Sequence, residues 1–170
     1  DNGIRLIDTT GAVTLTGDTV TGSYAHNVWL STTPGSTAAI TSLTVTNGSY
    51  NSSTRGDGFL VSLSNFASIA AGTISNATFA GNAAMGLNLV ANDNAVIGNG
   101  SGAPAAGTVT ITGSTFTNNN GIGASFASGG GIGPSNMYVR FVGNTLTGTR
   151  SHAVNIISGA GSAGGTQKVL

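Results

Sequence analysis

One sequence pattern recurs along this chain at intervals of roughly 30 residues. Its five copies are VTLTGDTV (13–20), LTVTNGSY (43–50), GTISNATF (72–79), VTITGSTF (109–116) and VRFVGNTL (139–146). Their last residues stand 30, 29, 37 and 30 residues apart, at Val20, Tyr50, Phe79, Phe116 and Leu146. A period of this length indicates a solenoid, in which each coil buries its apolar face against its neighbours.

Apolar and polar residues alternate within each copy, as expected of a strand with one buried face. The apolar residues five places before the last position are Leu15, Val45, Ile74, Ile111 and Phe141. A second alternating pair follows each copy, at Val28 and Leu30, Phe59 and Val61, Leu87 and Leu89, Ala124 and Phe126, and Val154 and Ile156. A third, weaker strand is expected at Ile40, Ile69, Ile97 and Ile132. Each coil is therefore predicted to contain three short strands.

These patterns predict an all-β fold, a right-handed parallel β-helix with about five coils of roughly 30 residues. The alternative, an antiparallel sandwich, would not require the same residue types at the same place in every repeat. The whole chain, 1–170, is expected to form a single β-helix segment from the interior of a longer solenoid. The one long spacing coincides with the Gly-, Ala- and Pro-rich stretch 99–107, which predicts a surface loop.

The composition argues against several classes of function. Only 6% of the residues are charged and the formal net charge is zero, so nucleic acid is not an expected partner, because it demands a concentrated basic patch. The chain has no cysteine, which excludes disulfides and cysteine-based zinc sites. No apolar run approaches the roughly 20 residues of a membrane span, so this segment is not expected to insert into a membrane. We expect no cofactor.

The repeated motif T-[VI]-[ST]-[GN]-x-[TS]-[FYL], followed by a Gly- or Asn-rich turn and a short apolar strand, resembles the right-handed β-helix passengers of bacterial autotransporters and adhesin-like surface proteins. The resemblance covers residues 13–157. It implies an extracellular or bacterial cell-surface location, and a role in adhesion or in the display of other domains. The same fold also carries pectate lyases, polygalacturonases and phage tailspikes, so the resemblance does not by itself decide between binding and catalysis.

An enzyme of this fold would need clustered carboxylates. Glycoside hydrolysis uses two carboxyl groups that flank one bond, and a calcium-dependent lyase uses a group of acidic ligands. The acidic residues occupy unmatched coil positions, at Asp1, Asp8, Asp18, Asp57 and Asp93. We interpret them as turn residues that bond to local backbone, so no catalytic residue and no metal ligand is expected. The alternative hypothesis is a fragment of a carbohydrate-active enzyme whose catalytic coils lie outside this segment.

Two features of the expected surface are candidate binding elements. Arg55-Gly56-Asp57 is an RGD tripeptide on the one turn that is longer by a residue, where it could act as an exposed integrin-type ligand or as an ordinary charged turn. Trp29 occupies an outward position whose equivalents are Leu60, Asn88, Ser125 and Asn155. An exposed tryptophan could stack on a sugar or form an adhesive spot, or it could pack under a loop or a missing coil.

Hydroxyl residues dominate the outward positions of the first strand on four coils. They are Thr14, Thr16, Thr44, Thr46, Thr73, Ser75, Thr110 and Thr112. They should align in two columns, which Arg140 and Val142 interrupt on the fifth coil. Regular threonine arrays resemble those of ice-binding β-solenoids, which makes ice binding a second alternative function. The simpler explanation is strand propensity with threonine pairing between strands.

Asparagine also recurs at fixed places in the repeat. We call the last residue of each copy the aligned position. Asparagine stands just before it at Asn47, Asn76 and Asn144, and three residues after it at Asn82 and Asn119. Stacked amides can bond along a parallel ladder, and asparagine tolerates the unusual backbone angles of tight turns. We interpret these residues as structural.

The first functional hypothesis is a non-enzymatic adhesin or stalk segment that offers a rigid contact surface. Its expected partner is a glycan or a protein on a host or neighbouring cell. Self-association through the ends of the solenoid or through its flat faces is a second expected contact.

Overall fold

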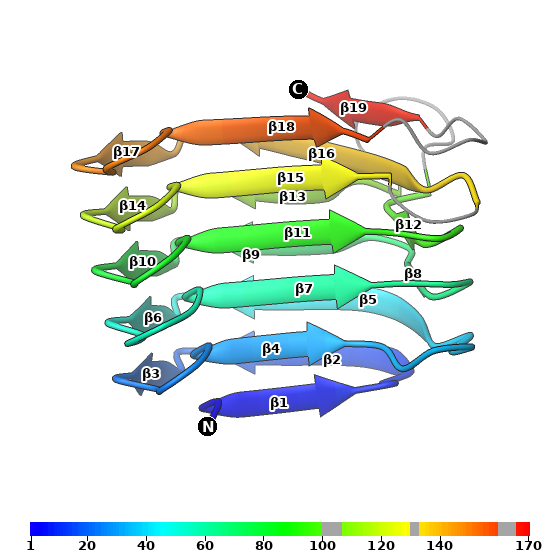
Figure 1. The fold of residues 1–170 in the computed structure, drawn as a ribbon, viewed down its shortest axis with the longest axis horizontal. Coiled ribbons are helices and arrows are strands. Elements are labelled where there is room, and N and C mark those ends of the chain that lie inside the picture. The colour runs from blue at the N-terminus through cyan, green and yellow to red at the C-terminus, as the bar shows by residue number, and fades with distance from the viewer. Residues whose placement is uncertain (100–106, 130–132, 160–165) are drawn as a thin grey trace.

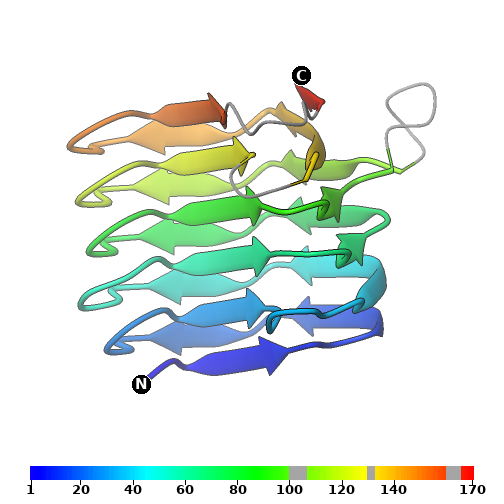
Figure 2. The ribbon, with the colours of Figure 1, turned by 45° about the vertical axis from the view of Figure 1, so that its right-hand side comes forward.

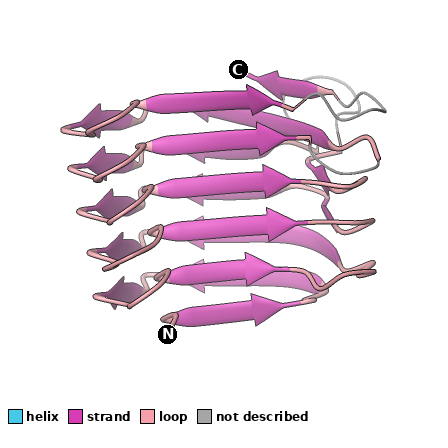
Figure 3. Cartoon of the chain, viewed as in Figure 1, coloured by secondary structure: helices cyan, strands magenta, loops and turns pink. Residues whose placement is uncertain are grey.

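Three parallel β-sheets run along the molecule in the computed structural model, which describes residues 1–99, 107–129, 133–159 and 166–170 (Figure 1). These residues form strands, turns and loops, with no helix among them (Figure 3). Neighbouring strands in each sheet come from successive coils. The prediction of a parallel β-solenoid with about five coils is confirmed.

The strands fall into sheets of six, five and eight strands. The six-stranded sheet contains β1 (Ile4–Ile7), β4 (Val28–Ser31), β7 (Phe59–Leu63), β11 (Leu87–Ala91), β15 (Ala124–Ser128) and β18 (Val154–Ser158). The five-stranded sheet contains β3 (Thr19–Thr21), β6 (Ser49–Asn51), β10 (Thr78–Ala80), β14 (Thr115–Thr117) and β17 (Thr145–Thr147). The eight-stranded sheet contains β2 (Gly11–Thr16), β5 (Ala39–Thr46), β8 (Ser68–Ile69), β9 (Gly72–Ser75), β12 (Val96–Ile97), β13 (Val109–Thr112), β16 (Asn136–Val142) and β19 (Gln167–Val169).

The coils wind in a right-handed sense. In Figure 1 the strands of the six-stranded sheet lie in front and run from left to right, whereas those of the eight-stranded sheet lie behind and run from right to left. The chain climbs from β1 at the bottom to β18 near the top, and this combination of directions defines a right-handed coil. The turned view in Figure 2 shows the coils as separate layers, stacked one above another.

Two backbone bends frame the short strand of the five-stranded sheet in every coil. The first bend has φ between 51° and 68°, at Gly17, Asn47, Asn76, Gly113 and Gly143. The second has φ between 53° and 71°, at Gly22, Ser52, Gly81, Asn118 and Gly148. Glycine and asparagine tolerate this left-handed conformation best, which explains why they recur at these places. The aligned position therefore lies in a three-residue strand of its own, beyond the bend that ends the first strand.

Aromatic rings stack at the aligned position through the middle of the molecule. The ring centroids of Tyr50 and Phe79 are 5.7 Å apart, and those of Phe79 and Phe116 are 4.9 Å apart with an interplanar angle of 14°. All three side chains are fully buried. Phe59, on the six-stranded sheet, meets the Tyr50 ring edge to face at 5.3 Å. Such ring pairs add to the burial energy of each side chain, so the stack is a main source of stability.

Buried asparagines form a ladder that follows this aromatic stack. Asn82 Nδ2 donates to the Tyr50 carbonyl at 3.1 Å and to Asn119 Oδ1 at 3.0 Å. Asn119 Nδ2 in turn donates to the Phe79 carbonyl at 2.9 Å. Both amide side chains are fully buried, so their hydrogen bonds satisfy backbone groups that would otherwise be orphaned inside the coil. The structural interpretation of these two asparagines agrees with this geometry.

The second coil has a serine, Ser53, where the ladder has asparagine in the third and fourth coils. Asn27 of the first coil fills that place, because its Nδ2 donates to Asn82 Oδ1 at 3.1 Å and to the Asn51 carbonyl at 2.9 Å. A Cβ on Gly58 would lie 2.6 Å from Asn82 Nδ2, which explains the glycine there. The part played by Asn27 does not follow from the repeat, because it stands elsewhere in its own coil.

Two predicted features fall wholly or largely outside the described residues. Ile132 lies outside the described residues, and the residue paired with Ile97 in the third-strand column is the buried Met137. The predicted loop 99–107 also falls mostly outside them, at 100–106. At its base the Asn99 N–H donates to the Gly107 carbonyl at 2.6 Å, and the strands on either side keep their register.

Replacement of Phe79 by alanine should remove the central ring of the stack. We expect Phe79→Ala to lower the free energy of unfolding by about 3–5 kcal/mol, because the cavity lies between two fixed rings. Guanidinium denaturation measures the change. Phe66→Ala is the matched control, since Phe66 is 67% exposed and its loss should change stability by no more than about 0.5 kcal/mol. Equal losses in both variants would contradict the stacked core.

Replacement of Asn82 by alanine should break the asparagine ladder at its middle. The buried Ser53 N–H, which donates to Asn82 Oδ1 at 3.0 Å, and the Tyr50 carbonyl would both lose a partner. We expect Asn82→Ala to cost about 2–4 kcal/mol of unfolding free energy. In the exposed control Asn120→Ala the same measurement should move by no more than about 0.5 kcal/mol. A loss at Asn82 as small as the control would show that the ladder contributes little.

Candidate binding surfaces

Hydroxyl side chains form two straight columns on the outside of the eight-stranded sheet. The first column pairs Thr14, Thr44, Thr73 and Thr110 in register. The second pairs Thr16, Thr46, Ser75 and Thr112. The fifth coil continues the two columns with Arg140 and Val142, as the sequence predicted. We call these eight residues the hydroxyl face.

Few of these hydroxyl groups are used to hold the coils together. Thr46 Oγ1 donates to Thr16 Oγ1 at 3.2 Å, and this is the one hydrogen bond that the described residues make to a hydroxyl of the face. Hydrogen bonding between threonines of adjacent strands therefore accounts for one contact in the array, between the first and second coils. The other hydroxyl groups are available to solvent or to an external partner.

A second set of outward hydroxyl groups lies on the five-stranded sheet and was missed by the sequence analysis. Its first column comprises Thr19, Ser49, Thr78, Thr115 and Thr145, and its second contains Thr21, Thr117 and Thr147. Asn51 and Ala80 interrupt the second column, and Asn51 bonds within the protein, to Ser49 Oγ at 2.6 Å and to the Ala80 N–H at 2.7 Å. The T-x-T pattern centred on the aligned position was the sequence signal that could have predicted it. The first column is therefore unbroken over five coils, whereas the second is not.

The RGD tripeptide does not present its carboxylate to solvent. Arg55 is exposed, but Asp57 is only 5% exposed. The Asp57 carboxylate accepts hydrogen bonds from the Met85 N–H at 2.9 Å and from Asn88 Nδ2 at 3.2 Å. A Cβ on Gly56 would lie 2.5 Å from the Ala25 carbonyl oxygen, so the glycine is required by close packing of two turns. Asp57 joins its coil to the next one, rather than bonding local backbone as expected.

His26 lies beside Asp57 on the neighbouring coil. The Asp57 N–H donates to His26 Nδ1 at 3.0 Å, and the same nitrogen is 3.7 Å from Asp57 Oδ2. Burial raises the pKa of Asp57, against the opposing effect of hydrogen bonds from Met85 and Asn88 and of the His26 charge. The site therefore holds a carboxyl group that gives up its proton less readily than an exposed aspartate.

Two arginines stack on aromatic rings at one corner of the molecule. The Arg5 guanidinium carbon is 4.8 Å from the centroid of the Trp29 ring, and that of Arg55 is 4.8 Å from the Tyr24 ring. The His26 ring centroid is 6.1 Å from that of Trp29. Trp29 is half-buried, whereas Tyr24 is 55% exposed. We call these five residues the aromatic corner.

Trp29 and Arg55 were candidates from the sequence, whereas the residues that stack on them, Arg5 and Tyr24, were not. The register Arg5↔Trp29 follows from aligning IRL (4–6) with VWL (28–30), a match that the alternation of apolar residues already offered. The pairing of Tyr24 with Arg55 had no such signal, because the turn that carries Arg55 is one residue longer.

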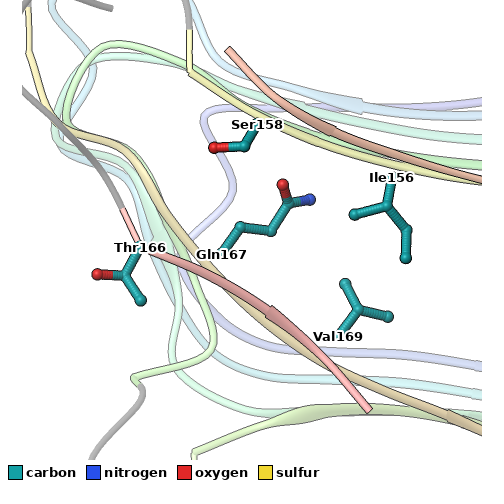
Figure 4. A pocket seen from close by; sticks show the side chains of 5 residues that line it. All are labelled: Ile156, Ser158, Thr166, Gln167 and Val169. Atoms are coloured by element: carbon teal, nitrogen blue, oxygen red, sulfur yellow. The ribbon is translucent and has the colours of Figure 1, made fainter. Parts of the chain in front are cut away.

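An open hollow lies at the C-terminal end of the stack, between β18 and β19 (Figure 4). Its lining consists of Ile156, Ser158, Thr166, Gln167 and Val169. Ile156 continues the inward column of Leu89 and Phe126, yet it is 54% exposed. The hollow is therefore the coil interior at the last described coil, and no ionisable side chain lines it. Self-association through the solenoid ends stays a prediction.

Within the described ranges, no three histidine or acidic side chains gather closely enough to hold a metal ion. The same residues include no helix long and apolar enough to cross a membrane. Comparison of the chain with protein-family models, with curated proteins and with solved structures finds no match. The solenoid fold is thus the level at which the chain is classified, and the likeness to autotransporter passengers stays a resemblance in sequence pattern.

The raised pKa of Asp57 predicts a pH dependence of stability. Its contribution is fully present below pH 3.8, the ordinary value, and is lost as the pH rises through the raised pKa. We therefore expect the wild type to lose stability relative to Asp57→Asn as the pH rises above 3.8. Denaturant unfolding of both proteins from acid to neutral pH measures this difference.

Asp8 supplies a control of opposite sign. Hydrogen bonds from the Ser36 and Thr33 side chains and from the Thr33 N–H lower its pKa, so its contribution is present above pH 3.8 and is lost as the pH falls through the lowered value. Asp8→Asn should therefore show the reverse trend. A flat difference for Asp57, or one with the sign of Asp8, would contradict the buried carboxyl group.

Proposed function

We propose that this chain is a non-enzymatic β-helical segment of an extracellular or bacterial cell-surface protein, of the adhesin or stalk type. It offers a rigid contact surface to a glycan or a protein on a host or neighbouring cell. The observation that carries the proposal is the hydroxyl face, in which eight hydroxyl groups stand in register. Among these eight groups the described structure contains one hydrogen bond, between Thr46 and Thr16. Polar groups without internal partners are available for recognition.

The core beneath this face supports the proposal, because it holds the coils at a fixed spacing. Val45, Ile74 and Ile111 point inward from the same strands that carry the hydroxyl groups, and all three are fully buried. Neighbouring strands of a sheet lie about 4.8 Å apart and alternate residues about 7 Å apart. The hydroxyl groups are thus fixed before any partner arrives, which lowers the entropy lost on binding.

Ice is a second candidate ligand for the same face. Its threonines offer a hydroxyl and a methyl group at two-dimensional spacings that repeat over four coils, and no charged residue enters the array before Arg140. An ordered lattice of water requires such regularity, whereas a soluble glycan or a protein does not. Thermal hysteresis and inhibition of ice recrystallisation test this candidate directly.

A lysine in the middle of the hydroxyl face should disrupt any contact made there. We expect Thr73→Lys to weaken binding to immobilised glycans, matrix proteins or whole cells by about tenfold or more, because a long charged side chain must be displaced or desolvated. Thr145→Lys is the matched control, an exposed threonine on the five-stranded sheet, and it should bind as the wild type does.

The other outcomes would move the contact site, change the function or overturn the proposal. Equal loss in both variants would place the contact outside the hydroxyl face. Hysteresis that disappears in Thr73→Lys would establish the ice-binding candidate. The absence of binding to all glycans, proteins, cells and ice would overturn the proposal. Depolymerisation of a polysaccharide that stops in an aspartate variant would instead establish the carbohydrate-active alternative.

A further inference from the structure

The aromatic corner combines two exposed guanidinium groups with the aromatic rings that lie beneath them. Arg5 lies over Trp29 and Arg55 lies over Tyr24, each at 4.8 Å. A guanidinium held over a ring still has N–H donors, in a fork that matches the two oxygens of a carboxylate or a sulfate. The rings hold these two forks in place.

Neither guanidinium is neutralised by the protein. The one acid–base contact within 4.0 Å among the described residues joins His26 and Asp57, and it involves no arginine. Asp57 stands two residues from Arg55 in the chain, but its carboxylate is turned inward to Met85 and Asn88. Two positive charges therefore remain uncompensated at this corner of a chain in which only 6% of residues are charged.

The corner is built on rigid elements. Arg5 and Trp29 are direct register partners on β1 and β4. The turn with Arg55 is tied to the turn with Tyr24, because the Thr54 hydroxyl donates to the Tyr24 carbonyl at 3.1 Å and the Thr54 N–H donates to the Ser23 carbonyl at 2.8 Å. His26 Nδ1 accepts the Asp57 N–H, so a neutral imidazole carries its proton on Nε2 as a further donor.

From this arrangement we infer that the aromatic corner binds an acidic glycan. The guanidinium groups of Arg5 and Arg55 pair with its carboxylate or sulfate groups, and the rings of Trp29 and Tyr24 hold these guanidinium groups in place. A nucleic acid would require a larger basic patch than two arginines provide. The inference rests on the proposed contact function and names the class of its ligand.

The test measures binding of the whole chain to alginate, a polyuronate, to dextran sulfate and to neutral dextran. We expect binding to at least one of the two acidic polymers, weaker with added salt, and no binding to dextran. The double variant Arg5→Gln/Arg55→Gln should bind about tenfold or more weakly. Trp29→Ala should weaken binding as well, because the Arg5 guanidinium loses the ring that orients it.

The double variant Arg140→Gln/Arg150→Gln is the control, because it removes the same charge from two exposed arginines of the fifth coil. It should bind as the wild type does. Equal loss in both double variants, unchanged binding in Arg5→Gln/Arg55→Gln, or equal binding of the wild type to dextran would overturn the inference. Absence of acidic-glycan binding, with another ligand still lost in Thr73→Lys, would overturn it and leave the proposed function standing. The preferred acidic polymer distinguishes carboxylate from sulfate.

Discussion

Each coil of this protein depends on the coils above and below it for its backbone hydrogen bonds. This holds even at the bends, where the Gly17 N–H donates to the Thr46 carbonyl at 2.9 Å and the Asn47 N–H donates to the Ser75 carbonyl at 3.0 Å. A bend that moved by one residue would interrupt the ladder on both sides and leave buried groups unpaired. The same conformation must therefore recur at the same place, which explains the repeated glycines and asparagines. The extra residues between Asn99 and Gly107 do not disturb the ladder, because the strands on either side keep their register.

The stacking of coils that pairs the backbone N–H and carbonyl groups also aligns the side chains in columns. Inside the coil, like residues meet like residues, so that aromatic rings stack and amides bond to amides. Outside it, the same register turns a threonine repeated in the sequence into a regular array of hydroxyl groups. The protein thus obtains a flat and rigid surface from a core whose regularity serves stability first. Surface recognition and core packing share one cause here, which is the fixed distance between coils.

The aromatic corner arises in the opposite way, from residues that break the repeat. Arg5, Trp29 and Leu60 share one outward column, yet no two of them are alike. The longer turn of the second coil brings Arg55 over Tyr24 and fits Gly56 against Ala25. Irregular positions on a regular scaffold are where binding sites are expected, because nothing in the stacking itself requires those side chains.

The sequence by itself determined the coil and most of its columns, because a period near 30 residues with alternating apolar residues requires each coil to bury its apolar face against the next. The handedness followed from the general preference of parallel crossovers. The alignment of the hydroxyl face followed from that register. The directions of individual polar side chains did not. The sequence predicts that Asp57 lies in an exposed turn. Its carboxylate is nevertheless buried, because Met85 and Asn88 of the next coil donate hydrogen bonds to it. Asn27 likewise enters the ladder because Ser53 leaves room for it. A repeat fixes where a residue stands along the coil, but the balance between water and a partner on a neighbouring coil decides which way its polar group turns.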